Sequence, residues 1–190
     1  MRCLVCQKLS FKLICTPCQK ERLVPHLSRR ELGCGLSVIS FYKFSEIEFL
    51  LKTKYTKIGS SIFKILAKNS FEAFSKSFEF DSKIYALSVD DSVKNGFSHS
   101  AVLAKYAKGK AIEPCYSKLI AKNSIKYAGK NLEFRLSNPK GFEYSGKPNI
   151  DVILIDDTIT TGTTLCEAQK AVERGKSRVL FALTLADAKE

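Results

Sequence analysis

The stretch DVILIDDTITTGTT, residues 151–164, places two adjacent carboxylates and five threonine hydroxyls directly after an apolar run. The apolar residues 152–155 predict a buried strand, and the pattern from Leu165 onwards predicts a helix. Backbone N–H groups at the start of a helix are unpaired and attract anions, and Gly162 lets the backbone approach a ligand without a Cβ in the way. The turn therefore predicts a phosphate cradle, with hydroxyl donors from Thr160, Thr161, Thr163 and Thr164.

Asp156 and Asp157, just before this turn, need a different kind of partner. A carboxylate accepts hydrogen bonds, so adjacent acids suit two neighbouring sugar hydroxyls or a hydrated Mg²⁺. Beside a phosphate cradle, they predict a sugar phosphate as the ligand. Two alternatives stay open: a strand end closed by an Asx turn and a threonine-rich cap, and a site for a metal alone. The turn lacks the lysine of a Walker loop and the glycine spacing of the dinucleotide fingerprint.

Four cysteines near the N-terminus form two C-x-x-C pairs, Cys3 with Cys6 and Cys15 with Cys18. Two such pairs can direct four thiolates to one point, which predicts a closed, structural zinc site with a small hairpin between the pairs. The alternative is redox-active or unpaired thiols. The remaining cysteines, Cys34, Cys115 and Cys166, stand alone in apolar or helical surroundings and are interpreted as small buried hydrophobic residues without a role.

The elements that must position these groups alternate along the chain. Strands are predicted over 37–44, 84–89, 112–120, 151–155 and 178–185. Helices are predicted from Ser45, where Glu48 completes a capping box, over 60–68, after Ser98, and over 163–174. Residues 121–149 are predicted to be mostly loop or hairpin. This alternation predicts an α/β fold with a mainly parallel sheet flanked by helices, and the acids fall at the carboxyl edge of that sheet.

We predict three regions: a zinc-binding module over 1–22, a linker over 23–36 and the α/β domain over 37–190. The formal net charge of +12 indicates either an anionic partner or simply many solvated lysines. The sequence contains no apolar run of the ~18 residues that a membrane span requires, and its first residues lack the apolar centre of a signal peptide. We therefore expect a cytoplasmic location, where the seven cysteines are thiols or metal ligands rather than disulfides.

The run VILIDDTITTGTTL resembles the phosphoribosyl-pyrophosphate (PRPP) signature of type I phosphoribosyltransferases. The resemblance implies that Asp156 and Asp157 bind the ribose 2- and 3-hydroxyls. It also implies that the 5-phosphate is held by the threonine–glycine run, so the expected ligand residues include Thr158, Thr160, Thr161, Gly162, Thr163 and Thr164. The pyrophosphate, with Mg²⁺, is expected near the loop around residues 89–92.

A four-cysteine module followed by this signature resembles the ComF family of competence-associated, phosphoribosyltransferase-like proteins. The segment KTKY (52–55) resembles the family's basic, aromatic segment after a helix. NGFSHSAVLAKYA (95–107) keeps the family's Gly-Phe and the helix that follows. Residues 124–142 keep Arg135, Asn138, Gly141 and Phe142, although Tyr127 stands where the family usually has glutamine.

Other positions depart from the family. The chain has VDDS where the family often has a Pro-Val-Pro-like loop, and Asp90 and Asp91 could either serve a hydrated Mg²⁺ or repel pyrophosphate. Asn95 replaces the family's arginine. His99 is either a catalytic group or a residue that caps a helix. No general base for a nucleobase is evident, so the catalytic residues stay unassigned.

Residues 105–147 combine positive charge with aromatic side chains, a pattern that suits single-stranded nucleic acid. The basic residues are Lys105, Lys108, Lys110, Lys118, Lys122, Lys126, Lys130, Arg135, Lys140 and Lys147. The aromatic residues are Tyr106, Tyr116, Tyr127, Phe134, Phe142 and Tyr144. The alternative is a solvated loop that covers the active site.

The resemblance implies a PRPP-binding protein that acts in natural transformation, with single-stranded DNA and the DNA-uptake machinery at the inner membrane face as expected partners. The alternative is an active phosphoribosyltransferase of nucleotide metabolism with an unknown acceptor. A third possibility is a zinc-stabilised interaction scaffold without a ligand. Whether the chain is an enzyme stays open at this point.

Overall fold

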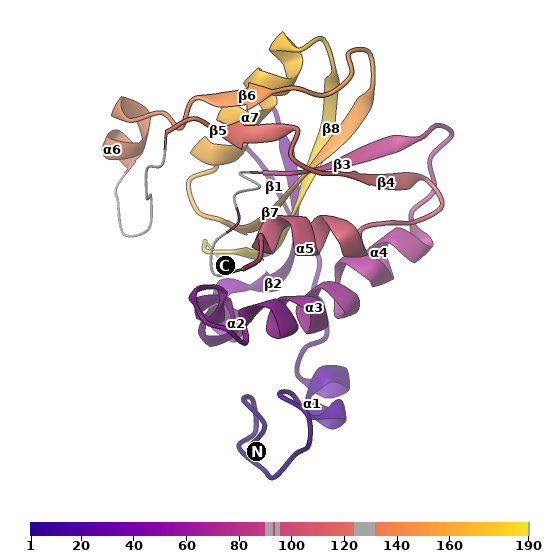
Figure 1. Cartoon of the computed structure of the whole chain (residues 1–190), viewed down its shortest axis with the longest axis vertical. Helices are drawn as coiled ribbons and strands as arrows, with labels where there is room; N and C mark the ends of the chain where they lie inside the picture. The colour runs from indigo at the N-terminus through magenta and orange to yellow at the C-terminus, as the bar shows by residue number, and fades with distance from the viewer. Residues whose placement is uncertain (90–92, 94–95, 124–131, 190) are drawn as a thin grey trace.

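The structure is a computed structural model that describes residues 1–89, 93, 96–123 and 132–189. Its main sheet has six strands in the order β1-β2-β8-β7-β3-β4 (Figure 1). They are β1 (Ser28–Glu31), β2 (Ser37–Lys43), β3 (Ile84–Ser88), β4 (Ile112–Cys115), β7 (Asp151–Ile159) and β8 (Arg178–Asp187). Within this sheet β1 alone runs antiparallel to its neighbour. The predicted α/β class with a mainly parallel sheet is confirmed.

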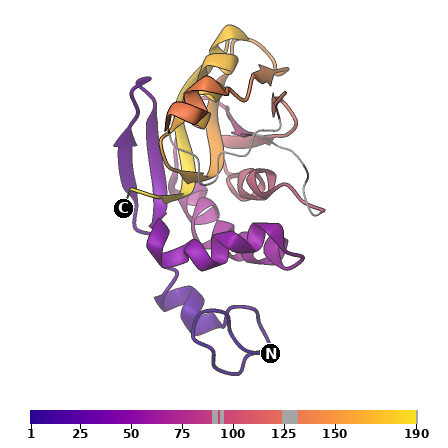
Figure 2. The ribbon, with the colours of Figure 1, turned by 90° about the vertical axis from the view of Figure 1, so that its left-hand side faces the viewer.

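Helices cover both faces of the sheet (Figures 1 and 2). One face carries α2 (Phe44–Leu51), the 3-10 helix η1 (Lys52–Tyr55), α3 (Gly59–Asn69), α4 (Phe71–Ser77) and α5 (His99–Tyr106). The other face carries α7 (Thr163–Arg174), the small β5–β6 pair (Leu119–Ala121 with Phe142–Tyr144) and, further out, α6 (Leu132–Ser137). Side-chain alternation along β7 supplies both layers, because Ile153 and Ile155 join the first core, and Val152 and Leu154 the second.

The predicted strand–helix–strand unit is present as β7–α7–β8, and its strands are parallel. The apolar stripe of α7 is buried as predicted, through Leu165, Ala168, Ala171 and Val172. Strand β7 continues to Ile159, beyond the predicted end at Ile155. The acids therefore lie within the strand rather than after it.

Several boundaries differ from the predictions for local reasons. The predicted strand over 112–120 is divided into β4 and β5, and Ser117 between them has a positive φ of 53°. The capping box is wrong: α2 already begins at Phe44, and no side chain caps it. The cap at Ser98 is confirmed, since its hydroxyl accepts a hydrogen bond from the Ala101 N–H at 3.1 Å. Strand β1 lies inside the predicted linker.

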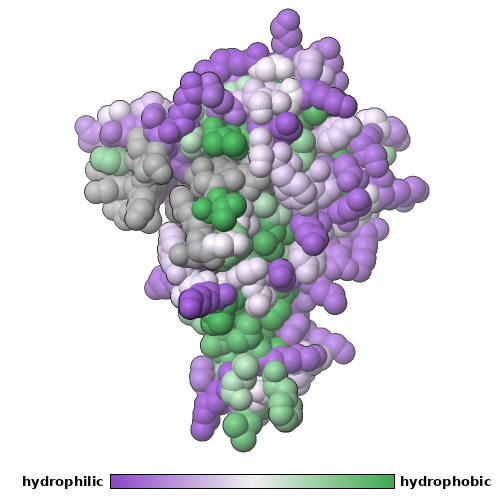
Figure 3. Space-filling model, viewed as in Figure 1, coloured by the Kyte–Doolittle hydropathy of each residue, from purple (hydrophilic) through white to green (hydrophobic). Residues whose placement is uncertain are grey.

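The N-terminal module projects from the face that carries α2 and α3 (Figure 2). It contains α1 (Thr16–Glu21), and the isolated bridge between Arg2 and Leu9 replaces the predicted hairpin. Leu9 and Phe11 of this module are exposed, and Figure 3 shows apolar surface at the lower end of the molecule. Hydrogen bonds tie the module and the segment after it to the α/β domain. The Asn69 amide donates to the Gln19 carbonyl of α1, the Tyr42 hydroxyl to the Leu23 carbonyl, and the His26 N–H to the Phe41 carbonyl.

Cys34 and Cys166 were predicted to be isolated buried thiols, and this prediction is wrong. They form a disulfide across 132 residues of sequence, with Cα atoms 6.0 Å apart, and both side chains are half-buried. The bridge joins the β1–β2 turn to the first turns of α7. These turns meet only through the sheet order, so sequence spacing gives no sign of the pairing. Cys115 is a free, half-buried thiol.

None of the described helices has the length and apolar content of a membrane span. The predicted pyrophosphate loop includes Asp90 and Asp91, which lie outside the described residues. The same holds for Lys126, Tyr127 and Lys130 of the basic segment.

Candidate functional site

The turn between β7 and α7 is built as an anion cradle. Gly162 adopts the left-handed conformation, with φ 83°, and precedes the first residue of α7. The hydroxyls of Thr161 and Thr163 lie 2.9 Å apart, and the Cys166 N–H donates to the Gly162 carbonyl at 3.0 Å. The two hydroxyls therefore lie together at the start of α7, the end of a helix that favours an anion such as phosphate.

The backbone at Gly162 is also closely covered. A Cβ atom at this position would lie 2.7 Å from the Cδ atoms of Leu32, which belongs to the β1–β2 turn. The positive φ favours glycine, and any larger residue would also require the Leu32 side chain to move. The β1–β2 hairpin therefore packs directly against the backbone of the cradle at Gly162.

Two arginines hold the cradle from different sides. Arg135, from α6, donates to the hydroxyls of Thr160 and, at 3.3 Å, Thr161. Arg30, from β1, donates to the Thr160 carbonyl at 2.9 Å and pairs with the buried carboxylate of Asp187 at 3.0 Å. Arg135 stands where a bound phosphate would meet a guanidinium, the side chain best matched to phosphate oxygens.

The two acids lie along β7 beyond the end of β3. Among the described residues, the β3–β7 pairing ends at Ser88 and Ile155, and Asp156 and Asp157 follow directly on β7. Asp157 is 5% exposed, whereas Asp156 is half-buried. The Asp157 N–H donates to Asp156 Oδ1 at 2.8 Å, which orients the Asp156 carboxylate. The structure therefore brings the acids to the carboxyl edge of the sheet, as predicted.

Asp157 is paired with basic side chains from the helical face. Lys54, from η1, donates to Asp157 Oδ2 at 2.7 Å, and the Lys54 side chain is 23% exposed. His99, at the start of α5, places Nε2 3.9 Å from the same oxygen, and its ring packs edge-on against Phe63. Gly59 allows η1 to pack closely against the start of α3, since a Cβ there would lie 2.2 Å from the Thr53 carbonyl oxygen.

These surroundings separate the two carboxyl groups chemically. Burial and the neighbouring charge of Asp157 raise the pKa of Asp156 well above its usual range. Burial alone would also raise the pKa of Asp157, but the ammonium of Lys54, with His99, holds the pKa of Asp157 below its usual range. Burial lowers the pKa of Lys54, but the charge of Asp157 outweighs it, so the pKa of Lys54 is raised overall. One acid is thus a fixed anion and the other can hold a proton.

Ligand atoms of His99, Asp156 and Asp157 lie within 4.8 Å of one another, so this cluster has the spacing of a cation site. However, the ammonium of Lys54 already occupies one oxygen of Asp157. The cluster is therefore better suited to hydroxyl groups, which can donate to the remaining carboxylate oxygens.

The remaining predicted ligand residues lie at the margin of the cradle. Thr158 lies within β7, opposite Ala186 of β8, and Thr164 belongs to the first turn of α7. Sequence reasoning missed Lys54, Arg30 and Arg135 as members of the site. The sequence contains a signal for two of them: Lys54 lies in the basic segment 52–55, and Arg135 is an arginine shared with the ComF pattern. Neither signal indicated a role in the site.

The four N-terminal cysteines form a second site, remote from the first in the ribbon (Figure 1). Their Sγ atoms all lie within 4.8 Å of one another, and those of Cys6 and Cys15 are 3.8 Å apart. Sulfur ligands at the usual Zn–S length stand about 3.8 Å apart in a tetrahedron. Cys3 and Cys18 are buried, so this cluster could hold a closed, structural zinc ion.

No protein-family model matches the chain, and no curated protein matches its sequence. Solved structures that are similar include a hypoxanthine phosphoribosyltransferase from Staphylococcus aureus, with 16% identity and a TM-score of 0.38. The match covers 67% of this chain and only 62% of that enzyme's chain. An adenine phosphoribosyltransferase from Leishmania tarentolae has 13% identity and a TM-score of 0.44, with 85% of this chain and 95% of that one covered. An orotate phosphoribosyltransferase from Mycobacterium tuberculosis has 17% identity and a TM-score of 0.39, with 89% and 81% covered. TM-scores below 0.5 mark a loose likeness, so the chemistry has to be deduced from this chain's own side chains.

Proposed function

We propose that the chain is a PRPP-binding, phosphoribosyltransferase-like protein. The observation that carries this proposal is the placement of Asp156 and Asp157 beside the Thr160–Thr164 turn at one edge of the sheet. A ribose 5-phosphate fits this arrangement chemically, with its phosphate on the turn and Arg135 and its two hydroxyls on the acids.

In a transfer reaction, an acceptor forms a bond to C1 of the ribose while the bond from C1 to pyrophosphate breaks. The described residues of this chain bind and orient the sugar: the cradle fixes the phosphate end, and Lys54 keeps Asp157 ionised so that it can accept from a hydroxyl. Magnesium would accompany PRPP and offset the charge of the pyrophosphate. Asp90 and Asp91 remain its proposed neighbours on the strength of the sequence alone.

Calorimetry with PRPP and Mg²⁺ tests the proposal. The wild-type chain should bind, and the Asp156→Asn, Asp157→Asn variant should bind about a hundredfold more weakly, because two charge-assisted hydrogen bonds are lost. Asp151→Asn is a matched control from the same strand. Asp151 pairs with Arg178 at the other end of β7, so its loss should leave the affinity unchanged.

Release of pyrophosphate during incubation with candidate acceptors separates a transferase from a binding protein. If the wild-type chain, with zinc bound and a cooperative melting transition, shows no heat of binding with PRPP, the proposed ligand is wrong. Equal affinities of the wild-type chain and the double variant would remove the acids from the site.

The finer proposal follows the resemblance to the ComF family: a cytoplasmic protein that acts in natural transformation, as single-stranded DNA enters the cell at the inner membrane face. The alternative is an active phosphoribosyltransferase of nucleotide metabolism whose acceptor is unknown. Measuring the transformation efficiency of cells that carry the Asp156→Asn, Asp157→Asn variant tests this proposal. A loss of transformation would show that the pocket is needed, and normal transformation would favour a scaffold that does not use the pocket.

Binding of single-stranded DNA is supported by one described surface segment. Tyr116 is 42% exposed between β4 and β5, and Lys118 and Lys122 lie exposed on either side of β5. An exposed ring can stack on a base while lysines contact phosphates. Two basic residues of the wider segment are already paired with acids, Lys108 with Glu113 and Lys122 with Glu143, which moderates its positive charge.

We expect a fluorescent oligo-dT to bind with an affinity that falls as salt rises. A Lys118→Ala, Lys122→Ala variant should flatten the slope of log affinity against log salt by about 1.4, the contribution of two phosphate contacts in a single strand. Tyr116→Ala should weaken binding by about 1–3 kcal/mol without changing the slope. The control Lys64→Ala, Lys68→Ala removes two exposed lysines from α3 and should have no effect. A salt-independent affinity would contradict this surface.

A further inference from the structure

The Cys34–Cys166 bridge lies directly behind the phosphate cradle. Cys166 occupies the second turn of α7, and its N–H donates to the carbonyl of Gly162, the residue on which the cradle turns. Cys34 occupies the β1–β2 turn, next to the residues that pack on Gly162. The disulfide thus joins the β1–β2 turn, which packs on the cradle, to α7, the helix that follows the cradle.

The same hairpin makes two further contacts with the cradle, through Leu32 against Gly162 and through Arg30 to the Thr160 carbonyl. These are non-covalent contacts of an edge strand that is only four residues long. The disulfide is the covalent contact between the hairpin and α7, so after its cleavage the described contacts of the hairpin with the cradle are the packing of Leu32 and the hydrogen bond of Arg30.

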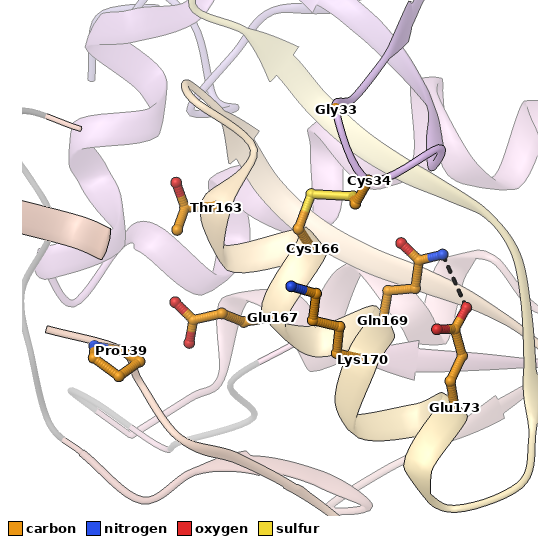
Figure 4. Close-up of a pocket in the computed structure, with 9 residues that line it drawn as sticks. All are labelled: Gly33, Cys34, Pro139, Thr163, Cys166, Glu167, Gln169, Lys170 and Glu173. Carbon is orange, nitrogen blue, oxygen red and sulfur yellow. Dashed lines mark hydrogen bonds between the residues drawn. A yellow bond between two sulfur atoms is a disulfide. The ribbon is translucent and has the colours of Figure 1, made fainter. Parts of the chain in front are cut away.

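The disulfide borders a cavity on the protein surface. A cavity of about 510 Å³ opens beside the bridge, and both cysteines line it together with Thr163 and Lys170 (Figure 4). Thr163 also belongs to the cradle, through its hydrogen bond with Thr161. A thiol reagent that enters this cavity therefore acts next to the phosphate-binding hydroxyls.

The surroundings of the two sulfurs differ in a way that gives the exchange a direction. Cys166 lies near the positive end of α7, and Lys170 follows one turn later on the same side of the helix (Figure 4). Both features favour a thiolate on Cys166, whereas the carboxylates of Glu167 and Glu173, which line the same cavity, oppose it. Since the helix end acts on Cys166 rather than on Cys34, it favours Cys166 as the leaving group and attack at Cys34.

We propose that Cys34–Cys166 is a thiol–disulfide exchange site for dithiol reductants, and that its cleavage loosens the cradle and weakens the binding of PRPP. A thiolate of the reductant attacks Cys34 Sγ, the Cys34–Cys166 bond breaks and Cys166 leaves as a thiolate. The second thiol of the reductant then attacks the mixed disulfide and releases Cys34. Two electrons pass from the dithiol, which becomes a disulfide, to the protein. The ligand part of the proposal rests on the proposed function.

The experiment compares the full-length chain before and after treatment with dithiothreitol, with the bridge followed by alkylation and mass spectrometry. PRPP with Mg²⁺ should bind at least about fivefold more weakly to the reduced chain, the lower end of common coupling between sites. By linkage, bound PRPP should then shift the equilibrium between the reduced and oxidised bridge by the same factor. For a fivefold change this lowers the reduction potential of the disulfide by about 20 mV. Zinc content is measured in each sample, so that damage to the N-terminal module is recognised.

The variant Cys34→Ser, Cys166→Ser should bind as the reduced chain does and should not respond to dithiothreitol. The control Cys115→Ser removes a free thiol and should keep the full response. Hydrogen exchange at residues 160–166 adds a measurement that needs no ligand, and it should become faster on reduction.

The outcomes separate the two proposals. Equal PRPP affinities in the two states, with the bridge verified in one and absent in the other, would overturn the exchange-site inference alone. Failure of both states to bind PRPP would overturn the proposed function. Hydrogen exchange then decides the inference: unchanged exchange at residues 160–166 overturns it, and faster exchange on reduction supports it.

Discussion

A Cys18→Ser variant is expected to lose stoichiometric zinc and the ordered structure of residues 1–22. The sulfur atoms of four cysteines cluster within 4.8 Å of one another in this module, and a serine hydroxyl would be a poor zinc ligand in place of one thiolate. Structural zinc contributes about 10–16 kcal/mol of apparent binding free energy in small modules, far more than so short a segment gains from burial alone. The module should therefore unfold rather than adjust.

The loss should extend into the α/β domain, because the two parts share a core. Cys3, Ile14 and Cys18 belong to the same buried cluster as Leu66 and Phe71 of the helical face. Unfolding of the module exposes part of that cluster, so the melting temperature of the whole chain should fall as well.

Metal analysis and limited proteolysis check this expectation. The wild-type chain should contain one zinc ion and resist cleavage before residue 23, whereas Cys18→Ser should contain none and be cut there. Cys115→Ser, which removes a free thiol far along the sequence, should keep both properties. One firmly bound zinc in Cys18→Ser would show that the four cysteines are not its ligands.

A Lys54→Met variant is expected to lose about 3 kcal/mol of unfolding free energy at neutral pH, the usual cost of leaving one member of a buried ion pair alone. Asp157 is 5% exposed, and its 2.7 Å contact with Lys54 supplies the main compensation for its burial. Methionine fills similar space without a charge. The variant should also bind PRPP more weakly, because Asp157 is then free to take up a proton.

The pH dependence of this loss has a definite sign. Since the pKa of Asp157 is lowered in the folded state, the pair stabilises the fold above the unfolded pKa, about 3.9. That stabilisation disappears as pH falls from there through the lowered folded pKa. Without Lys54, burial raises the folded-state pKa of Asp157, so the difference between the wild-type chain and Lys54→Met should be largest at high pH and should shrink as pH falls through that raised pKa.

Urea denaturation of a double-mutant cycle measures the pair directly. Lys54→Met in the Asp157→Asn background should cost much less than in the wild-type background, because no anion is left unpaired. Lys52→Met is a matched control from the same 3-10 helix, since the pair between Lys52 and Glu48 is well exposed. Equal costs of Lys54→Met in both backgrounds would mean that the ion pair does not stabilise the fold.

The central part of the fold is predictable from sequence because local pattern and burial agree there. In β7–α7–β8 the apolar run, the Thr–Gly turn and the stripe from Leu165 to Val172 all specify one arrangement. The acids and the cradle follow from that unit, since a strand and the helix after it position them over a short distance. Their placement needs no knowledge of the rest of the chain.

Residues that reach the site from other elements were not predictable in this way. Lys54 meets Asp157 across 103 residues and Arg30 meets Thr160 across 130, so both contacts depend on which strands become neighbours. Cys34 and Cys166 were misjudged for the same reason. Strand β1 was missed because SRRE is charged and half-exposed, as suits an edge strand, and therefore lacks an apolar pattern.

The position of β2 in the sheet has a consequence for how the chain folds during synthesis. This strand carries the buried residues Val38, Phe41 and Tyr42, and its residues 37–40 pair on one side with β1, which lies close in sequence. On the other side the strand pairs with β8, about 135 residues further along the chain. At about 5–20 residues per second, a ribosome needs roughly 7–27 s to supply that partner. For this period the edge of β2 is open to strands of other chains, so the risk of aggregation is concentrated early in synthesis and ends when residues 178–187 emerge.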